Sequence, residues 1–483
     1  MNTAFDKYEA VIGLEVHAQL ATKSKLFCGD SIEFGADPNT HISPITLGYP
    51  GTLPKTNKKA VEFAIKMGLA CNCEIERDNY FARKNYFYPD LPKGYQISQH
   101  TTPVCKGGYV TIKTNEGFRN VRLNRIHLEE DAGKSIHDVD ENYTCVDYNR
   151  AGTPLIEIVT EPDLYSAEEA YQYITEVRRL VRWIGICDGN MEEGSLRCDA
   201  NVSIRLKGES RLGTKVEVKN LNSIRNVKKA IEYEIQRMIN EVENGGVIIQ
   251  QTRSFDANTD TTFAIRDKEE ANDYRYFAEP DLPQFHLSDS DIESIQNNLP
   301  ALPNALINKY CFEFGLSEYD AAQLCLEKEI ADYFEELTPH TNNYKAAANW
   351  LNGPIRQYVN ENKITFNELE LKPQRLAELL KLVDEGKVNF SVASTRVLPV
   401  LIHSKEKNAL QVATELNVLQ VSNSNEVESW VNEVLNKMPA KISEYKKGKK
   451  GLIGLFVGEV KKISKGKADP KIVTELLEQK LNT

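Results

Sequence analysis

The stretch AVIGLEVHAQL, residues 10–20, decides the fold class of this chain. Its apolar and polar side chains alternate, which is typical of a β-strand with one buried face. Because successive side chains of a strand point to opposite faces, Glu15 and His17 share one face, and Leu14 and Val16 share the other. The stretch therefore predicts a strand of an antiparallel sheet that buries one face and keeps the other polar.

Four more stretches in the N-terminal half alternate in the same way. They are GYVTIKT (108–114), NVRLNRIHLEED (120–131), SLRCDANVSIRL (195–206) and TKVEVKNLN (214–222). Helical patterns interrupt them: Ser166 and Glu169 predict a capping box ahead of AYQYITEVRRLVRWIG, and an apolar stripe runs from Asn222 or Ser223 to Gly245. A large antiparallel sheet with such helices predicts the α+β class.

Helical periodicity takes over after the proline-spaced stretch from Pro280 to Pro303. DAAQLCLEKEIADYFEEL and QRLAELLKLVDEG carry helical periods without a strand pattern, and a weaker break at 403–407 precedes a lysine-rich end. The 483 residues are enough for about three domains. We expect an antiparallel-sheet domain at 1–290, an all-α domain at 291–405 and a small basic helical tail domain at 406–483.

Composition narrows the class of protein. Hydrophobic residues make up 41% of the chain and charged residues 27%, which is the profile of a folded globular protein. No apolar run approaches the roughly 18 residues that cross a bilayer, so we expect no membrane partner. The N-terminus resembles neither a secretory signal nor a transit peptide, and nine cysteines, an odd number, favour reduced thiols. These features favour a cytoplasmic protein.

Two of the strand-like stretches could contribute ligands to a divalent cation. Glu15 and His17 can share a metal ion, although a solvated strand face would look the same. In LNRIHLEEDAGKS (123–135), Glu129 shares its face with Arg125, His127 and Asp131, whereas Glu130 points to the opposite face. Carboxylates beside a histidine suit magnesium, but an acidic turn at the end of a strand has the same composition.

Glu157 is the only charged residue in the run from Leu155 to Val159, within AGTPLIEIVTEPD. A carboxylate in such a strand must be paired, protonated or bound to a metal. We interpret Glu157 as a functional residue. A structural ion pair or a solvent-facing edge strand is the alternative.

The last two strand-like stretches carry residues suited to phosphate chemistry. The polar face of SLRCDANVSIRL contains Ser195, Arg197, Asp199 and Asn201, and that of TKVEVKNLN contains Glu217 and Lys219. Arg197 and Lys219 could neutralise transferring phosphates, and Glu217 could share a metal. A solvated antiparallel sheet explains the alternation equally well.

The segment ARKNYFYPDLPKGYQISQ mixes cations with aromatic rings. Its Arg83, Lys84 and Lys93 are interleaved with Tyr86 and Tyr88, a composition suited to stacking on a base or holding a ribose, although core aromatics are comparably common. The sequence contains no G-x-x-x-x-G-K-[ST], no G-x-G-x-x-G after a strand and no G-x-S-x-G. If ATP is used, it must therefore bind a magnesium site on the sheet.

Several motifs, in order, resemble one family. They are VIGLEVHAQL with TKSKLFC, LGYPGTLP, RKNYFYPDLPKGYQISQ, HLEEDAGKS, NRAGTPLIEIVTEPD, MEEGSLRCDANVSIR, EVKNLNS and DYRYFAEPDLP. Together they closely resemble the B subunit of the aspartyl/glutamyl-tRNA amidotransferases, and the helical part and lysine-rich end are similar to the helical and tail domains of that family. The resemblance covers nearly the whole chain. It implies that the first domain, at 1–290, corresponds to the cradle domain of that family.

The resemblance implies a reaction on misacylated Glu-tRNA(Gln) or Asp-tRNA(Asn). ATP phosphorylates the side-chain carboxylate, and ammonia then displaces the phosphate. By the resemblance, magnesium is held by Glu15, His17, Glu129 or Glu130, and Glu157, with Glu129 favoured by the face assignment. The expected catalytic residues are Glu157, Glu217, Lys219 and Arg197. The expected residues for ATP or substrate are Arg83, Lys84, Tyr86, Tyr88, Lys93, Ser195, Asp199 and Asn201.

The resemblance also implies partners. Ammonia comes from glutamine on a separate amidase, the A subunit, and a small third protein, the C subunit, ties the pair into a heterotrimer. This chain alone should then lack glutaminase activity. Two other hypotheses remain open: a non-catalytic RNA-binding scaffold with structural acidic clusters, and a free-standing amide ligase for a small acid.

One departure from the family concerns zinc. The resemblance suggests that many relatives carry four cysteines around KLFC, whereas here Cys28 is accompanied by Asp30, Ser43 and Thr46 at the positions that we align. A four-cysteine zinc site cannot form from these residues, and the C-x-C of Cys71 and Cys73 is weak evidence for a metal. We predict no zinc.

The lysine-rich end is basic in a chain of net charge -11. Ten lysines lie between Lys441 and Lys471 against three acidic residues. Such a segment suits sequence-independent contacts to tRNA phosphates, although a solvated helical face is the alternative. The expected tRNA-binding residues are Lys446, Lys447, Lys449 and Lys450 first, then Lys461 and Lys462.

Overall fold

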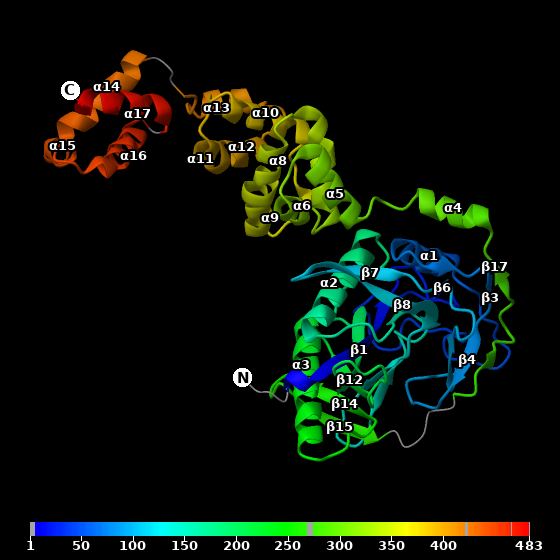
Figure 1. Ribbon diagram of the computed structural model, residues 1–483. Coiled ribbons are helices and arrows are strands. Elements are labelled where there is room, and N and C mark those ends of the chain that lie inside the picture. Colours follow the sequence, from blue (N-terminus) through cyan, green and yellow to red (C-terminus); the bar gives the residue numbers. More distant parts are fainter. Residues whose placement is uncertain (1–4, 268–273, 421–423, 465, 483) are drawn as a thin grey trace. The chain divides into compact units, whose positions relative to one another are not determined.

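The computed structural model describes residues 5–267, 274–420, 424–464 and 466–482 (Figure 1). Asp273, the first residue of the DYRYFAEPDLP motif, lies outside these ranges. The chain divides into two compact units, Met1–Leu302 and Pro303–Thr483. The first contains a large sheet with helices and the second is helical, so the α+β prediction is confirmed. Among the described residues, no helix is both long and apolar enough to span a membrane.

A ten-stranded sheet forms the centre of the first unit. Strand β1 (Tyr8–Gln19) lies between β11 (Pro154–Thr160) and β12 (Leu196–Leu206) and runs antiparallel to both. Beyond β12 the order is β13 (Val216–Leu221), β14 (Gln251–Asp256) and β15 (Thr261–Asp267). Beyond β11 it is β8 (Gly117–Glu130), β6 (Cys105–Lys106) and β2 (Glu74–Ile75), and β7 (Tyr109–Thr114) pairs with β8.

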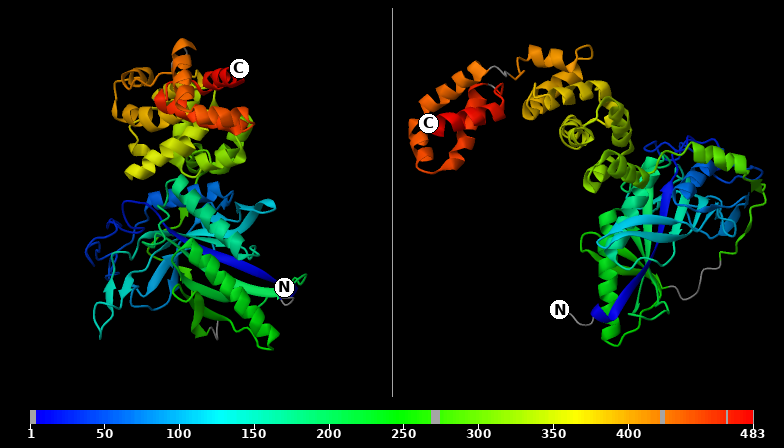
Figure 2. Two further views of the ribbon diagram at one scale, coloured as in Figure 1. Left: turned by 90° about the vertical axis from the view of Figure 1, so that its left-hand side faces the viewer. Right: turned by 45° about the horizontal axis from the view of Figure 1, so that its top comes forward.

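All five alternating stretches lie in this sheet, and their apolar side chains are buried on one face. One strand pair departs from the antiparallel prediction, because β13 and β14 are parallel. Helix α3 (Ile224–Glu243) connects them, and a helical crossover is the usual connection between parallel strands. Figure 2 shows this long green helix lying along the sheet.

The apolar face of the sheet packs against α2 (Ala167–Trp183) and α3, which also contact each other (Figure 1). Ser166 caps α2 by accepting a 3.1 Å hydrogen bond from the amide of Glu169, as the capping-box prediction requires. The reciprocal bond differs from that prediction: the carboxylate of Glu169 accepts from the amide of Tyr165 at 2.7 Å and from Arg119 at 3.0 Å. Ser223 caps α3 in the same way, through the amide of Asn226.

Shorter elements complete the first unit. The helices are η1 (Phe5–Lys7), α1 (Lys58–Ala70) and α4 (Asp289–Asn297). Small sheets join β4 (Ala82–Asn85) to β5 (Tyr95–Ser98) and β16 (Phe277–Ala278), β3 (Asp78–Asn79) to β17 (Phe285–His286), and β9 (Lys134–Ile136) to β10 (Cys145–Asp147).

Within its described residues the second unit contains helices and no strand. The elements up to His403 are α5 (Pro303–Phe314), α6 (Glu318–Leu324), α7 (Lys328–Leu337), η2 (Thr338–His340), α8 (Tyr344–Trp350), η3 (Leu351–Ile355), α9 (Arg356–Asn362), η4 (Phe366–Glu368), α10 (Pro373–Asp384), α11 (Phe390–Val392), η5 (Ala393–Val397) and α12 (Leu398–His403). The remaining elements are α13 (Ala409–Glu415), α14 (Ser424–Lys437), α15 (Pro439–Lys446), η6 (Lys450–Leu452), α16 (Ile453–Ile463) and α17 (Pro470–Asn482).

The C-terminal helices α14 to α17 share a core of their own. Its members include Val431, Tyr445, Phe456, Val460 and Leu477, all buried. The compact-unit boundary follows Leu302, and α4 belongs to the first unit. The separation of a third domain near residue 405 stays a prediction.

Candidate active site

Strand pairing gathers the charged residues of the polar face into rows across the sheet. His17 on β1 is paired with Glu157 on β11 and with Arg197 on β12, and Glu157 is paired with His127 on β8. Two residues along β1, Glu15 is paired with Asp199. Directly paired residues of neighbouring strands point their side chains to the same face of a sheet. The side chains of these rows therefore all lie on the polar face.

His17, Glu157 and His127 of the first row form a compact cluster of two imidazoles and two carboxylates with Glu129, which lies two residues beyond His127 on β8. The Nε2 atom of His127 lies 3.3 Å from Glu157 Oε2 and 3.6 Å from Glu129 Oε2. The Nε2 atom of His17 lies 3.6 Å from Glu157 Oε2 and 3.8 Å from Glu129 Oε1. One ligand atom each from His17, Glu129 and Glu157 lie within 4.8 Å of one another. We call these four residues the histidine–carboxylate cluster.

The charges of this cluster stabilise one another. Burial alone would raise the pKa of Glu157, but the charges and hydrogen bonds of His127 and His17 hold that pKa well below its usual range. Burial alone would lower the pKa of His127, yet Glu157 and Glu129 raise it to about 9. The pKa of His17 is also raised, because bonds and charges from Glu157 and Glu129 outweigh its burial. Glu157 is therefore a buried carboxylate that stays ionised.

A second acidic group lies beside the first. Carboxylate oxygens of Glu15, Asp199 and Glu217 lie within 4.8 Å of one another, and we call these three residues the carboxylate cluster. Lys219 donates to Asp199 at 2.6 Å and lies 2.9 Å from Glu217. Asn201 donates to Glu15 at 2.9 Å. Burial and the charge of Glu157 raise the pKa of Glu15, so the two clusters interact electrostatically.

Glu129 and Glu130 have different partners. Glu130 accepts from Lys93 Nζ at 2.6 Å and from the amide of Ile97 at 2.8 Å, away from the histidines. Glu129 faces both histidines. The geometry therefore favours Glu129 over Glu130 for a metal on the polar face, in agreement with the face assignment.

In the segment that mixes cations with aromatic rings, some residues lie beside the histidine–carboxylate cluster and others pair with residues elsewhere in the first unit. Lys84 lies over the rings of Tyr274 at 5.0 Å and Tyr86 at 5.7 Å. Burial lowers the pKa of Lys84, but Glu129, Tyr276 and Glu157 outweigh it and raise that pKa, so Lys84 is a cation beside the histidine–carboxylate cluster.

The other members of that segment are placed differently. Arg83 makes two bonds, of 2.7 and 2.8 Å, to the carboxylate of Glu279. Lys93 is paired with Glu130, while Tyr88 is 57% exposed. These three do not face the two acidic clusters through any hydrogen bond or ion pair among the described residues.

Arg197 is held by a buried carboxylate that sequence reasoning placed on this face without assigning it a role. Asp131 accepts from both terminal nitrogens of Arg197, at 2.9 and 3.0 Å, and from Gln19 at 2.7 Å. Burial would raise the pKa of Asp131, but Arg197 and Arg150 lower it to about 2. Ser195 donates to Asp188 at 3.3 Å, at the edge of the same face. Asp131 thus fixes the guanidinium of Arg197.

His127 was not among the expected site residues either. Its spacing in LNRIHLEED placed it on the face of Glu129. The signal that would have identified it is the register of β8 against β11, which sets His127 opposite Glu157.

Comparison of the sequence with known proteins identifies the family to which this chain belongs. The family profile described as "GatB/GatE catalytic domain" matches residues 10–293, and that described as "GatB domain" matches residues 332–481. A protein of Thermodesulfovibrio yellowstonii, named as the B subunit of an aspartyl/glutamyl-tRNA(Asn/Gln) amidotransferase, is 50% identical over 471 residues, covering 98% of both chains. The chain belongs to the B-subunit family of the aspartyl/glutamyl-tRNA(Asn/Gln) amidotransferases.

Other relatives with the same name show equally broad similarity. The protein of Geotalea daltonii is 49% identical over 98% of this chain and 99% of its own length. That of Persephonella marina is 47% identical over 98% of this chain and 100% of its own length. The resemblance found in the motifs is thereby confirmed over nearly the full length.

In this member of the B-subunit family, three of the four positions considered for zinc, those of Cys28, Asp30 and Thr46, meet in space. Cys28 Sγ lies 3.3 Å from Asp30 Oδ2 and 3.3 Å from Thr46 Oγ1, and Thr46 donates to Asp30 at 2.5 Å. One thiol, one carboxylate and one hydroxyl thus bond to one another. These residues do not make the thiolate- and imidazole-rich set that structural zinc requires, so the prediction of no zinc stands as a prediction.

The lysines of the tail differ in how firmly they are held. Lys449 pairs with Glu444 at 3.0 Å, Lys462 pairs with Glu459 at 2.6 Å, and Lys450 lies 4.2 Å from the ring of Tyr445. Lys446, Lys447 and Lys461 make no side-chain hydrogen bond or ion pair to any residue that the structure describes. They are the most available for an anionic partner.

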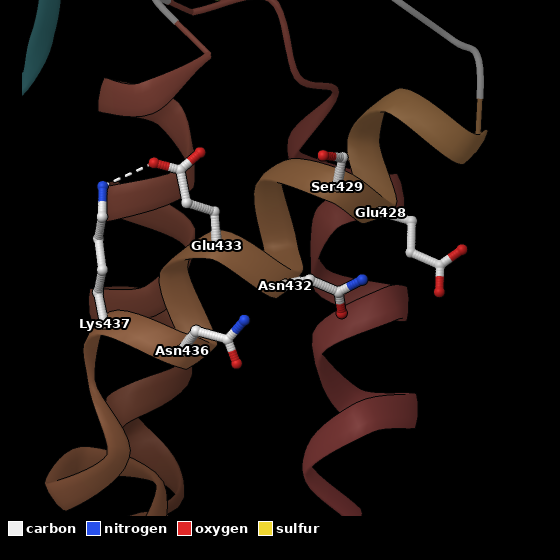
Figure 3. Close-up of a pocket in the computed structure, with 6 residues that line it drawn as sticks. All are labelled: Glu428, Ser429, Asn432, Glu433, Asn436 and Lys437. Carbon is white, nitrogen blue, oxygen red and sulfur yellow. Dashed lines mark hydrogen bonds and ion pairs between the residues drawn. The ribbon is translucent and has the colours of Figure 1, made fainter.

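A hollow of about 750 Å³ on α14 lies apart from these lysines (Figure 3). Its six lining residues all come from that one helix, and Glu433 and Lys437 form an ion pair among them. Among the residues that the structure describes, no second element contributes a side chain to it. The hollow therefore lacks the convergent groups of a binding site.

Proposed function

We propose that this chain activates the side-chain carboxylate of a misacylated tRNA, Glu-tRNA(Gln) or Asp-tRNA(Asn), within a glutamine-dependent amidotransferase. The observation that carries the proposal is the presence of two acidic clusters beside Arg197 and Lys219 on one face of the sheet, with Lys84 of the neighbouring strand β4 close to the histidine–carboxylate cluster. Relatives over the whole length are named as the B subunit of that amidotransferase. An ATP-dependent carbon–nitrogen ligase is the corresponding enzyme class.

The proposed chemistry has two balanced steps. An oxygen of the substrate carboxylate attacks the γ-phosphorus of ATP, and ADP leaves with the bridging oxygen. The nitrogen of ammonia then attacks the acyl carbon, phosphate leaves, and a proton is lost to give the amide. A free carboxylate is a poor electrophile, and phosphorylation gives it a leaving group.

The donor set fits magnesium. Five carboxylates and one imidazole, in two groups of three, are the oxygen-rich ligands that Mg²⁺ prefers. We assign His17, Glu129 and Glu157 to one ion and Glu15, Asp199 and Glu217 to a second position. Bound magnesium would offset the charge between the carboxylate and the γ-phosphate.

The side chains of this protein prepare the face for these reactants. Glu157 stays ionised between two imidazoles, so it presents a fixed negative charge. Arg197, held by Asp131, and Lys219, held by Asp199, present oriented cations to phosphate oxygens. Lys84 adds a third positive charge, and Ser195 and Asn201 offer further polar contacts.

The proposal includes partners and a compartment. Ammonia would be supplied by an amidase as the A subunit, a small C subunit would complete a heterotrimer, and the tail lysines would contact tRNA phosphates. We place the complex in the cytoplasm. No glutaminase activity is expected from this chain alone.

The test is Glu157→Gln in the complex assembled with its amidase and small subunits. The variant keeps the shape of Glu157 but removes its charge, so amidation should fall at least about a hundred-fold while tRNA affinity stays unchanged. Glu234→Gln is the matched control, because Glu234 is likewise a buried, paired carboxylate, bound to Arg237 and Arg253 outside the polar face. A Glu157→Gln complex with normal turnover would favour the non-catalytic scaffold.

A further inference from the structure

The described part of the motif DYRYFAEPDLP runs along strand β4, the strand of Lys84, because its own strand β16 pairs with β4. The residues just ahead of β16 are fastened to β4 by Asn85. The amide nitrogen of Asn85 donates to the carbonyl oxygen of Tyr274 at 2.9 Å, and its side-chain Nδ2 donates to the carbonyl oxygen of Arg275 at 2.8 Å. Asn85 thus sets the path of this segment beside Lys84.

The backbone at Arg275 is strained. Its φ angle is 45°, in the left-handed region that a residue with a Cβ atom rarely adopts. Such a conformation persists only where neighbouring groups hold it, and it is concentrated at functional sites. The two bonds from Asn85 reach the carbonyl groups on both sides of the Arg275 Cα atom, so they hold this turn directly.

The segment places aromatic rings against the ammonium group of Lys84. The Nζ atom of Lys84 lies 5.0 Å from the ring centre of Tyr274 and 5.7 Å from that of Tyr86, an arrangement in which the ring faces attract the cation. The ring of Tyr276 packs edge-to-face on that of Tyr274, with 6.1 Å between centres. On its other side Tyr276 stacks on His100, at 4.1 Å and an angle of 8°. The position of Lys84 is therefore set by rings.

The other two cations of the site are held differently. Arg197 and Lys219 are each bonded to a carboxylate, that of Asp131 or of Asp199. The ammonium group of Lys84 makes no hydrogen bond or ion pair with any residue in the described part of the chain. Its three N–H groups therefore stay available to an anion.

The register of β4 shows where this ammonium group lies. Lys84 is paired with Gln96 on β5, two residues before Ser98, so the side chains of Lys84 and Ser98 share a face. Ser98 donates to Glu129 Oε2 at 3.3 Å. Glu129 and Glu157 both attract the charge of Lys84. The free ammonium group thus lies at the edge of the histidine–carboxylate cluster.

We propose that Asn85, Tyr274 and Tyr276 are positioning residues of the proposed reaction, which hold the ammonium group of Lys84 where it contacts the phosphoryl group passed to the substrate carboxylate. None of the three touches the reactants in this role, and each acts through Lys84. Rings suit the task because they orient a cation without neutralising its charge, and a cation with free donors suits a transferring phosphate. The inference rests on the proposed function for the identity of the anion.

The first test is a double-mutant cycle in the complex assembled with its amidase and small subunits. Single-turnover amidation is measured for Tyr274→Leu, for Lys84→Met and for the double variant. Tyr274→Leu should slow the reaction roughly two- to thirty-fold, the strength of one cation–ring contact, and should cause no further loss in the Lys84→Met chain. Damage to the fold alone would instead add to the loss from Lys84→Met. Additive losses, or a normal rate in Lys84→Met, would overturn the inference.

Further variants separate the ring from the rest of the side chain. Tyr274→Phe keeps a ring face and should stay within about two-fold of the unaltered rate. Asn85→Ala should slow the reaction, again without further effect in Lys84→Met. Tyr171→Leu is the matched control, because the ring of Tyr171 on α2 lies 5.9 Å from the Nζ atom of Lys228, outside the polar face, and its loss should leave the rate unchanged. A Tyr274→Phe rate as low as that of Tyr274→Leu would overturn the role of the ring.

A second measurement follows Lys84 without any reaction. Ring currents displace the NMR signal of a methylene group that lies over an aromatic ring. In the full-length chain with isotope-labelled lysine, the ε-methylene signal that is missing from Lys84→Arg should be displaced upfield, and it should move in Tyr274→Leu but not in Tyr171→Leu. An undisplaced signal would overturn the placement of Lys84.

These tests and that of the proposed function can fail separately. If the positioning role fails, the losses at Lys84 and Tyr274 are additive while Glu157→Gln still abolishes amidation. If the proposed function fails, Glu157→Gln has normal turnover, whatever the position of the Lys84 signal.

Discussion

The proposed site depends on buried side chains that stay charged because oppositely charged side chains face them. Glu157 is 8% exposed and stays ionised because His17 and His127 face it from both neighbouring strands. The sequence indicated that a lone carboxylate in an apolar strand needs a partner, and Glu157 is indeed paired with the two histidines. It could not identify His127 as that partner, because the pairing depends on which strands are neighbours and in what register.

Lys25 offers a test of electrostatics at another buried residue. It is fully buried and donates to the carbonyl oxygens of His41 at 2.7 Å and Tyr148 at 3.3 Å. Burial lowers the pKa of Lys25 to about 8. Between that value and the unfolded pKa of about 10.4 the unfolded chain binds the additional proton, so the free energy of unfolding should rise with pH.

We therefore expect the unaltered chain to gain roughly 2–3 kcal/mol relative to Lys25→Met between pH 8 and pH 10.5. Urea unfolding followed at Trp183 measures the first unit when Trp350 and Trp430 are replaced by Phe in both chains. A difference that stays constant over this pH range would mean that Lys25 titrates normally in the folded state.

At the scale of elements, alternation located all five predicted strands, because each has one face on the core. Their order across the sheet was not predictable in this way. Strand β11 lies between β1 and β8 although its core is a short apolar run, and this order sets Glu157 between two histidines. Contacts between strands distant in sequence, and not local pattern, decide such an arrangement.

The N-terminal cap of α2 gives a prediction at this scale. Ser166→Ala removes the bond to the amide of Glu169 and should cost about 1 kcal/mol. Amide exchange measured by mass spectrometry should accelerate about five-fold in the first turn of α2 and little elsewhere. Ser294→Ala, an exposed position inside α4, is the control and should leave exchange nearly unchanged. Exchange in α2 that matches the control would show that Glu169 and Arg119 hold this end without Ser166.

At the scale of the whole molecule, the spacing of apolar residues distinguished a sheet-rich part from a helical part. This is possible because side chains return to the same face every 2 residues in a strand and every 3.6 residues in a helix. The compact boundary after Leu302 lies within the proline-spaced stretch that the sequence singled out. The sequence indicated a basic helical tail from residue 406, but the membership of its core, α14 to α17, could not be predicted because it depends on which helices pack together.

The basic tail makes a prediction about the assembled complex. Lys446→Glu with Lys447→Glu should weaken tRNA binding and lower the slope of log affinity against log salt by roughly 1.4 to 1.8, because two phosphate contacts are lost. ATP hydrolysis by the complex should stay nearly intact. Lys437→Glu on α14, which breaks the pair with Glu433, is the control. A binding curve that is unchanged across the salt range would remove these lysines from tRNA recognition.

The most direct measurement of the central claim is a single turnover with ATP labelled at the γ-phosphate. The assay contains magnesium, Glu-tRNA(Gln) and this chain assembled with its amidase partner, and the ammonia donor is withheld. We predict labelled acyl phosphate on the tRNA-bound glutamate with the unaltered chain and none with Glu157→Gln, although that variant still binds tRNA. Label that persists undiminished in Glu157→Gln would contradict the claim that the polar face of this sheet activates the carboxylate.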